Sequence, residues 1–180
     1  ALYAKRTVIL NNLYGVDIDQ GAVEICKLRL WLSMVADIEN DPDDVEPLPN
    51  IDFNIRQGNS LMGYVSFLDD DDTENVQGTL GEWGVVENKV EAKYGDVLET
   101  IQEHKNASSG EVASQKRREA EELIQKYSKD FDENILERFH EMGYEDMKLE
   151  DLQDFSPFHW VLEFAEVYAK GGFDVLIGNP

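Results

Sequence analysis

The stretch Leu-Tyr-Gly-Val-Asp-Ile-Asp at residues 13–19, with the proline-free residues 20–38 after it, decides the fold. The first part is a short apolar run that ends in acid, which is typical of a buried strand. The second part has apolar side chains at helical spacing on two faces, one with Val23 and Cys26 and one with Ile25 and Leu28. We therefore expect a largely buried helix, and the order strand, tight turn and helix predicts an α/β unit.

The two acids after this strand have different expected roles. In a Rossmann-like sheet, an acid at the carboxyl end of the second strand accepts hydrogen bonds from the ribose hydroxyls of a nucleotide cofactor, and Asp17 has that place. Asp19 directly precedes the helix and is better interpreted as its N-cap. The alternative for Asp17 is a carboxylate that only stabilises the turn.

A second strand is predicted at residues 52–57, where polar and apolar side chains alternate. It is followed by Gly58, which allows a sharp exit, and by Asn59, whose amide is then positioned to hydrogen-bond a purine edge. By themselves these residues are also an ordinary turn.

The carboxyl end of the sequence repeats this pattern. Residues 173–177 predict a short strand, and it leads into Asn179 and Pro180. An exocyclic amine on a planar ring is a poor nucleophile, so an enzyme must hold both N–H groups with acceptors. The Asn179 side-chain carbonyl and the Pro180 backbone carbonyl suit this task, because proline fixes φ and has no competing N–H. A plain turn is the alternative here too.

Three strand ends in order, each with a polar residue of the required type, are more specific than any one of them. Here the sequence resembles the S-adenosylmethionine-dependent adenine-N6 DNA methyltransferases of the large restriction-modification type, in which modification and cleavage domains are often fused. The stretches that carry the resemblance are residues 12–19, 22–25, 28–32, 48–52, 58–61, 158–160, 163–164 and 173–180.

The resemblance implies a role for each candidate site residue. Asp17, Ile18 and Asn59 would bind S-adenosylmethionine, with Asp17 on the ribose and Asn59 near the adenine. Asn179 and Pro180 would begin the acceptor site for the amine of the target base. Many methyltransferases have Asp at the position of Asn59, so here an amide would replace a carboxylate.

The fold class that we expect is α/β, a partial Rossmann-like methyltransferase fold with a helical-hairpin insertion. Residues 1–64 would form the second and third strands with their helices, residues 65–155 an acidic loop and the insertion, and residues 156–180 a return helix and the fourth strand. The family's glycine-containing first motif would lie upstream of residue 1. We therefore expect a piece of a larger enzyme, inactive alone, unable to bind the cofactor usefully and open to self-association at unpaired strand edges.

The predicted reaction is direct methyl transfer to the amine of a flipped adenine. Methylation of an RNA base or of a protein glutamine amide is a close alternative, because the same acceptor chemistry serves them. A non-catalytic acidic module that binds basic proteins is an alternative of another class.

The net charge of −22 is unusual for a DNA-binding chain, which should be basic. Acid is spread over every segment, so we favour a halophile's solvated surface, with double-stranded DNA bound through domains not in this sequence. An acidic face remote from DNA and a DNA mimic are the other readings. No run approaches the roughly 20 apolar residues of a membrane span, and a cytoplasmic location is expected.

No metal site is predicted. Cys26 is the single cysteine, and His104, His140 and His159 are far apart in sequence with no ligand spacing around them. Surface or packing roles are expected for the histidines.

Helical spacing predicts a hairpin of two helices within the insertion. Val90, Tyr94, Val97 and Ile101 mark the first helix, Ala120, Leu123, Tyr127 and Phe131 mark the second, and residues 106–110 are the turn. Residues 65–87 are expected to be an irregular loop. The hairpin is interpreted as a solvated insertion without a direct catalytic part, and residues 116–118, Lys-Arg-Arg, are its candidate phosphate contact. A helical stripe over residues 158–168 should end at the two glycines 171–172.

Overall fold

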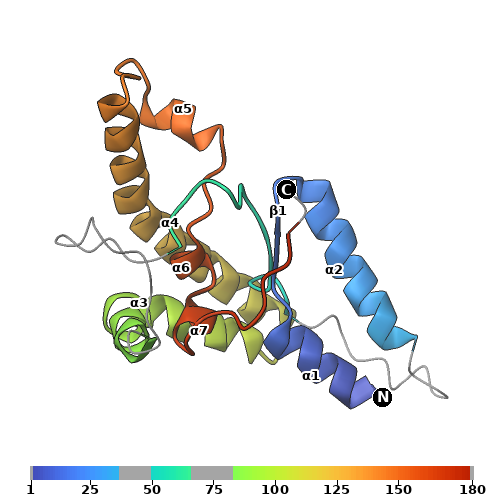
Figure 1. Ribbon diagram of the computed structural model, residues 1–180. Coiled ribbons are helices and arrows are strands. Elements are labelled where there is room, and N and C mark those ends of the chain that lie inside the picture. Colours follow the sequence, from blue (N-terminus) through green and yellow to red (C-terminus); the bar gives the residue numbers. More distant parts are fainter. Residues whose placement is uncertain (1, 37–49, 66–82, 179–180) are drawn as a thin grey trace.

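The computed structural model describes residues 2–36, 50–65 and 83–178. Helix α1 (Leu2–Asn12) leads into strand β1 (Gly15–Asp17), helix α2 (Gln20–Val35) and strand β2 (Ile55–Gln57). The rest of the described chain is helical: α3 (Trp83–Lys105), α4 (Gly110–Glu141), α5 (Leu149–Gln153), α6 (Trp160–Glu163) and α7 (Ala165–Tyr168). In Figure 1, α1 and α2 lie to the right, α3 and α5 to the left, and α6 and α7 between them.

The two strands are parallel neighbours, with Gly15 opposite Ile55 and Asp17 opposite Gln57. Parallel strands require a crossover between them, and α2 belongs to that crossover. The predicted strand–turn–helix unit and the second strand are therefore present, in a mixed helical molecule with a small two-stranded parallel sheet.

Both strands are shorter than the sequence pattern predicts, and the second begins three residues late. Asn54 explains the late start, because its buried side chain donates to the carbonyls of Leu10 and Leu13 at 3.0 and 3.1 Å. Its backbone N–H bonds back to Ile51 at 3.0 Å. Residues 52–54 therefore form a turn anchored on the end of α1.

The prediction of a strand at residues 173–177 is wrong, because the structure has no strand there. Val175, Leu176 and Ile177 are 73%, 70% and 90% exposed. A strand needs a neighbour to satisfy its backbone groups, and no described segment pairs with this one. Within this segment Phe173 packs on other rings, with centroid distances of 5.6 Å to Phe164 and 5.8 Å to Tyr14.

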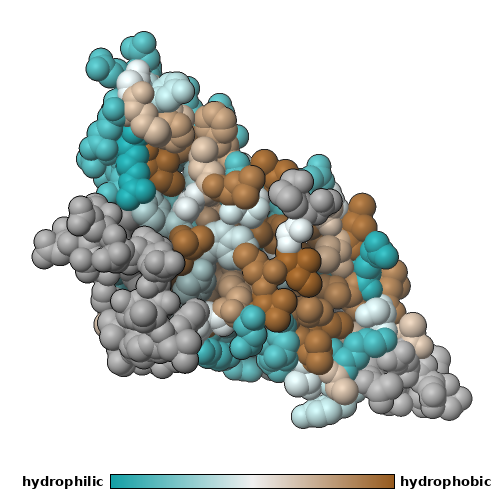
Figure 2. All heavy atoms as spheres, in the orientation of Figure 1, coloured by the Kyte–Doolittle hydropathy of each residue, from teal (hydrophilic) through white to brown (hydrophobic). Residues whose placement is uncertain are grey.

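Helix α2 is also less buried than expected. Val23 and Met34 are buried, whereas Ile25, Leu28 and Leu32 are 60%, 49% and 49% exposed, and Cys26 is exposed too. One apolar face packs on α1 and Ile51, and the other has no cover in the described part of the chain. Figure 2 shows apolar surface over α2 and the segment after Phe173.

Helices α3 and α4 confirm the predicted pair, joined by residues 106–109, although α3 begins within the expected loop, of which residues 66–82 lie outside the described chain. Ser109 caps α4 by accepting the Val112 N–H. The helices share the largest core cluster with Phe53, Val161 and Leu162. The predicted helix at residues 158–168 is instead split into α6 and α7 by the non-helical backbone of Phe164, and Gly171 and Gly172 follow with positive φ.

Candidate functional site

The carboxyl ends of β1 and β2 meet at one edge of the sheet. Asp17 is the last residue of β1, and its carbonyl accepts the Gly58 N–H at 2.9 Å. Asn59 follows Gly58, so the structure places Asp17 and Asn59 at neighbouring strand ends. Ligands of parallel α/β sheets bind at this edge.

Of the two acids at the end of β1, Asp19 has the predicted capping role, and Asp17 makes the turn contact that was the alternative to its predicted cofactor role. Asp19 caps α2, because its Oδ1 accepts the Ala22 N–H at 2.7 Å. Asp17 is exposed, and its Oδ1 accepts the Asp19 N–H at 2.8 Å. The Asp17 carboxylate therefore stabilises the turn and still faces solvent.

Ile18 lies between them with its side chain 60% exposed. Its carbonyl accepts a hydrogen bond from Gln57 Nε2 at 3.2 Å. Gln57 thus ties the end of β2 to the turn after β1, a contact that the alternating pattern of the strand does not reveal.

Asn59 is held by a segment from a distant part of the chain. Its N–H donates to the Ser156 carbonyl at 2.7 Å, and it forms a parallel bridge with Pro157. Its side-chain Oδ1 accepts the Leu61 N–H at 3.1 Å. The turn therefore uses the amide oxygen and leaves the Nδ2 donors for another partner.

Two glycines let this distant segment approach. A Cβ at Gly58 would lie 2.6 Å from Cδ2 of Phe158, and one at Gly63 would lie 2.1 Å from the Phe158 carbonyl oxygen. Gly63 also has a φ of +139°, which favours glycine. Ser156, with φ of 52°, is the one described non-glycine residue with positive φ. The Asn59 turn is therefore tightly specified by residues 156–158.

A buried pair, His159 and Asp132, contacts the end of this turn at Tyr64. The pair was not predicted as part of a site. His159 Nε2 is 3.0 Å from Asp132 Oδ1, and the Tyr64 N–H donates to His159 Nδ1 at 3.3 Å. Burial raises the pKa of the Tyr64 phenol above its usual value. The Phe-His-Trp stretch was a sequence signal for His159, but no local pattern joins it to an acid 27 residues away.

Asn179 and Pro180, the predicted amine acceptors, lie outside the described residues. The structure thus brings Asp17, Ile18 and Asn59 together and leaves the two acceptors as predictions.

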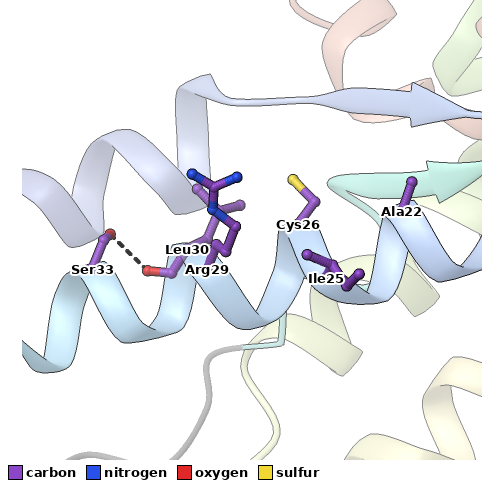
Figure 3. A pocket seen from close by; sticks show the side chains of 6 residues that line it. All are labelled: Ala22, Ile25, Cys26, Arg29, Leu30 and Ser33. Atoms are coloured by element: carbon purple, nitrogen blue, oxygen red, sulfur yellow. Dashed lines mark hydrogen bonds between the residues drawn. The ribbon is translucent and has the colours of Figure 1, made fainter.

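An open groove of about 520 Å³ lies elsewhere, along one face of α2. Its lining residues all belong to that helix: Ala22, Ile25, Cys26, Arg29, Leu30 and Ser33. Figure 3 shows the Cys26 thiol and the Arg29 guanidinium on this face, and the Ser33 hydroxyl bonded to the Leu30 carbonyl at 2.8 Å. None of the predicted site residues lines the groove.

The basic cluster of the hairpin is engaged by acids. Lys116 bonds Glu103 and Glu119 at 2.8 Å each, which raises the pKa of the lysine. Arg117 lies 3.0 Å from Glu121 and 3.4 Å from Asp52. A phosphate contact by these two cations would have to displace carboxylates.

Within residues 2–36, 50–65 and 83–178, no helix is long and apolar enough to cross a membrane. No group of three or more His, Cys, Asp or Glu side chains in the same residues has the arrangement of a metal site.

The parallel strand ends, the capped helix after the first and the polar residues at the shared edge are compatible with a fragment of an α/β methyltransferase. Comparison with known proteins agrees: this chain belongs to the Eco57I restriction-modification methylase family, which matches residues 11–180.

A curated relative extends the comparison. The chain is 30% identical, over 220 aligned residues, to a type II restriction enzyme and methyltransferase predicted in Methanocaldococcus jannaschii. The alignment covers 98% of this chain and 18% of the relative, so the chain spans less than a fifth of that protein's length. No solved structure matches the chain.

Proposed function

We propose that this chain is part of the catalytic domain of a DNA methyltransferase that transfers a methyl group from S-adenosylmethionine to the N6 amine of a flipped adenine. One observation carries the proposal: Asp17 and Asn59 lie at adjacent ends of parallel strands in a member of a restriction-modification methylase family. The proposed layout is a methyltransferase core in residues 1–64 and 156–180, interrupted by residues 65–155.

The residues at the shared edge fit an adenosine-containing cofactor. The exposed Asp17 carboxylate can accept hydrogen bonds from ribose hydroxyls, although its Oδ1 already holds the turn. The exposed Ile18 side chain offers apolar surface to a flat base, and the Nδ2 group of Asn59 offers donors to a purine edge. S-adenosylmethionine supplies the methyl group when it is bound.

Asn179 and Pro180 hold and orient the substrate amine in this proposal. Their carbonyl oxygens accept the two amine N–H groups, which directs the nitrogen lone pair and stabilises the positive charge that develops on nitrogen. The same acceptors suit an RNA base or a glutamine amide, so the choice of substrate must be tested directly.

DNA is bound through parts of the enzyme outside this chain. The net charge is −22, and Lys116 and Arg117 already contact carboxylates. A surface with this charge repels the phosphate backbone.

Two substitutions in the protein at its full natural length test the proposal. Asp17→Ala should raise the dissociation constant for S-adenosylmethionine by about tenfold in a calorimetric titration, because a charge-assisted hydrogen bond is lost. Asn179→Ala should slow single-turnover methylation of a duplex with the target adenine by about a hundredfold, or about 3 kcal/mol, with little change in cofactor affinity.

Glu122→Gln is the matched control, because Glu122 is an exposed acid on α4. It should alter neither quantity. Methylation of RNA or of a glutamine peptide in place of duplex DNA would reassign the substrate, and a near-normal rate in Asn179→Ala would remove the role given to that residue.

A further inference from the structure

His159 connects the α3/α4 hairpin with the turn that carries Asn59. It is 2% exposed and is the N-cap of α6. Its ring stacks on Phe131 of α4 with a centroid distance of 4.8 Å, and on Tyr64 at 6.2 Å. The imidazole therefore lies between the hairpin and the end of the Asn59 turn.

The hydrogen bonds of His159 define its tautomer. The Tyr64 backbone N–H can only donate, so Nδ1 of His159 must accept at 3.3 Å. The proton of the neutral ring is then on Nε2, which donates to Asp132 Oδ1 at 3.0 Å. Asp132 is itself buried, so its carboxylate fixes both the orientation and the tautomer of the ring.

Residues 156–160 bond along the whole Asn59 turn. The Asn59 N–H donates to Ser156, the Phe158 N–H donates to the Met62 carbonyl at 2.7 Å, and Trp160 Nε1 donates to the Ser60 carbonyl at 3.1 Å. The contact of Tyr64 with His159 completes this series. A movement of His159 therefore shifts the segment that holds Asn59.

Helix α4 holds His159 and Tyr64 through further side chains besides the Asp132 carboxylate. Phe131 packs on the imidazole, and Arg138, two helical turns later, lies over the Tyr64 ring at 5.4 Å. Ser156 has a left-handed backbone conformation that costs energy unless its surroundings impose it. Together these contacts hold the 156–160 segment in one position relative to α4.

We propose that Asp132 and His159 are positioning residues of the cofactor site, through which the α3/α4 hairpin sets the geometry of the Asn59 turn. This inference rests on the proposed function, because it assumes that Asn59 contacts S-adenosylmethionine. An apolar side chain at position 132 would leave the His159 Nε2–H without its acceptor. An apolar side chain at position 159 would leave both the Tyr64 N–H and the Asp132 carboxylate without a partner.

The test compares Asp132→Ala with Asp132→Asn in the protein at its full natural length. The asparagine keeps an acceptor oxygen for His159 Nε2, whereas the alanine removes it. Calorimetric titration with S-adenosylmethionine should show about a tenfold higher dissociation constant for Asp132→Ala and a value close to wild type for Asp132→Asn. Glu133→Gln, an exposed neighbour on α4, is the control and should bind like wild type.

The readouts separate positioning from a general loss of structure. A role in folding alone would lower the titrated stoichiometry and leave the dissociation constant of the folded fraction unchanged. Positioning raises the dissociation constant at full stoichiometry, and methylation at saturating cofactor stays within about twofold of wild type. If Asp132→Ala does not fold, His159→Asn replaces it, since it keeps an acceptor near Tyr64 and loses the donor to Asp132.

Each result has one meaning. Equal dissociation constants for wild type and Asp132→Ala would overturn this inference and leave the proposed function intact. An equally weakened Asp132→Asn would also overturn it, because the geometry of the acceptor would then not be the cause. Failure of the wild-type protein to bind S-adenosylmethionine would overturn the proposed function first.

Discussion

Helix α2 of the strand region is richer in apolar residues than helix α4, but the α3/α4 hairpin buries its apolar side chains more completely. In the hairpin, Val90, Val97 and Ala120 are fully buried. In the strand region, Leu28 and Leu32 of α2 are about half exposed, and Val175 to Ile177 are largely exposed. The two helices of the hairpin face each other across one short connection, and Phe53, Val161 and Leu162 complete their core. The strand region needs partners that the described residues do not provide.

The test with the largest expected effect compares two side-chain truncations, one in each region. Phe131→Ala removes a ring that is 1% exposed in the main core cluster, and should lower the free energy of unfolding by about 3–5 kcal/mol. Leu28→Ala, on the uncovered face of α2, should lower it by less than about 1 kcal/mol. Urea denaturation of both variants measures this, and similar losses would show that α2 is buried in solution.

A second test addresses the turn between the two regions. Gly63→Ala should cost about 2–3 kcal/mol, because the new Cβ would meet the Phe158 carbonyl and the positive φ would be strained. Gly110→Ala at the start of α4 is the control, since no heavy atom lies within 4 Å of its added Cβ. Thermal melting of the two variants should differ clearly, and a tolerated alanine at Gly63 would mean that residues 156–158 are loosely held.

The same difference explains which elements could be predicted from the sequence. Asp19 as N-cap, the helix predicted at residues 20–38 and the α3/α4 pair follow from spacing within a few residues. The structure confirms the cap, the pair and the helix over Gln20–Val35, and residues 37–38 lie outside the described chain. The face that a helix buries depends on other elements, so Cys26 was wrongly assigned to a buried face.

Strands and distant contacts were harder to predict for the same reason. Residues 173–177 have strand composition, but a strand forms only where a neighbour accepts its hydrogen bonds. The edge shared by Asp17 and Asn59 was predictable, because parallel strands end together. The His159–Asp132 pair was not, because it depends on how α4 lies against the Asn59 turn.

The third test concerns Asp52, where the two regions meet. Its carboxylate faces His104 of α3 at 3.6 Å, Lys27 of α2 at 3.0 Å and Arg117 of α4 at 3.4 Å. The nearby His104 imidazole, and then Lys27 and Arg117, hold the pKa of Asp52 well below its usual range, against the effect of burial. Asp52→Asn should therefore destabilise the protein at neutral pH, by about 1–2 kcal/mol.

The pH dependence of the free energy of unfolding shows whether the charge of Asp52 causes this effect. Because the folded pKa is depressed, the contribution of Asp52 is complete above its unfolded pKa of about 4 and is lost as the pH falls towards the folded value. The gap between wild type and Asp52→Asn in chemical denaturation should be constant near neutrality and close in strong acid. Asp154→Asn, at an exposed position after α5, is the control. A gap that does not close would assign the loss to packing instead of charge.

The test with the smallest expected effect measures how the melting temperature depends on salt concentration. It separates the contribution of charge from that of packing in both regions. The chain has 38 acidic and 16 basic residues, so repulsion among its acids opposes folding at neutral pH. Raising the salt concentration from about 0.01 M to 1 M shortens the screening length from about 30 Å to about 3 Å. The melting temperature should rise by a few degrees. The rise is limited because surface ion pairs such as Arg117 with Glu121 weaken under the same screening.

The control for that measurement is the same salt series near the isoelectric point of about 4.3, where net repulsion vanishes. Salt that acts by screening net charge should raise the melting temperature at neutral pH and have little effect at this lower pH. An equal rise at both pH values would point to apolar surface, such as the exposed face of α2, as the feature on which salt acts. No dependence at neutral pH would contradict the halophilic interpretation of the charge, and would favour a surface that binds basic proteins.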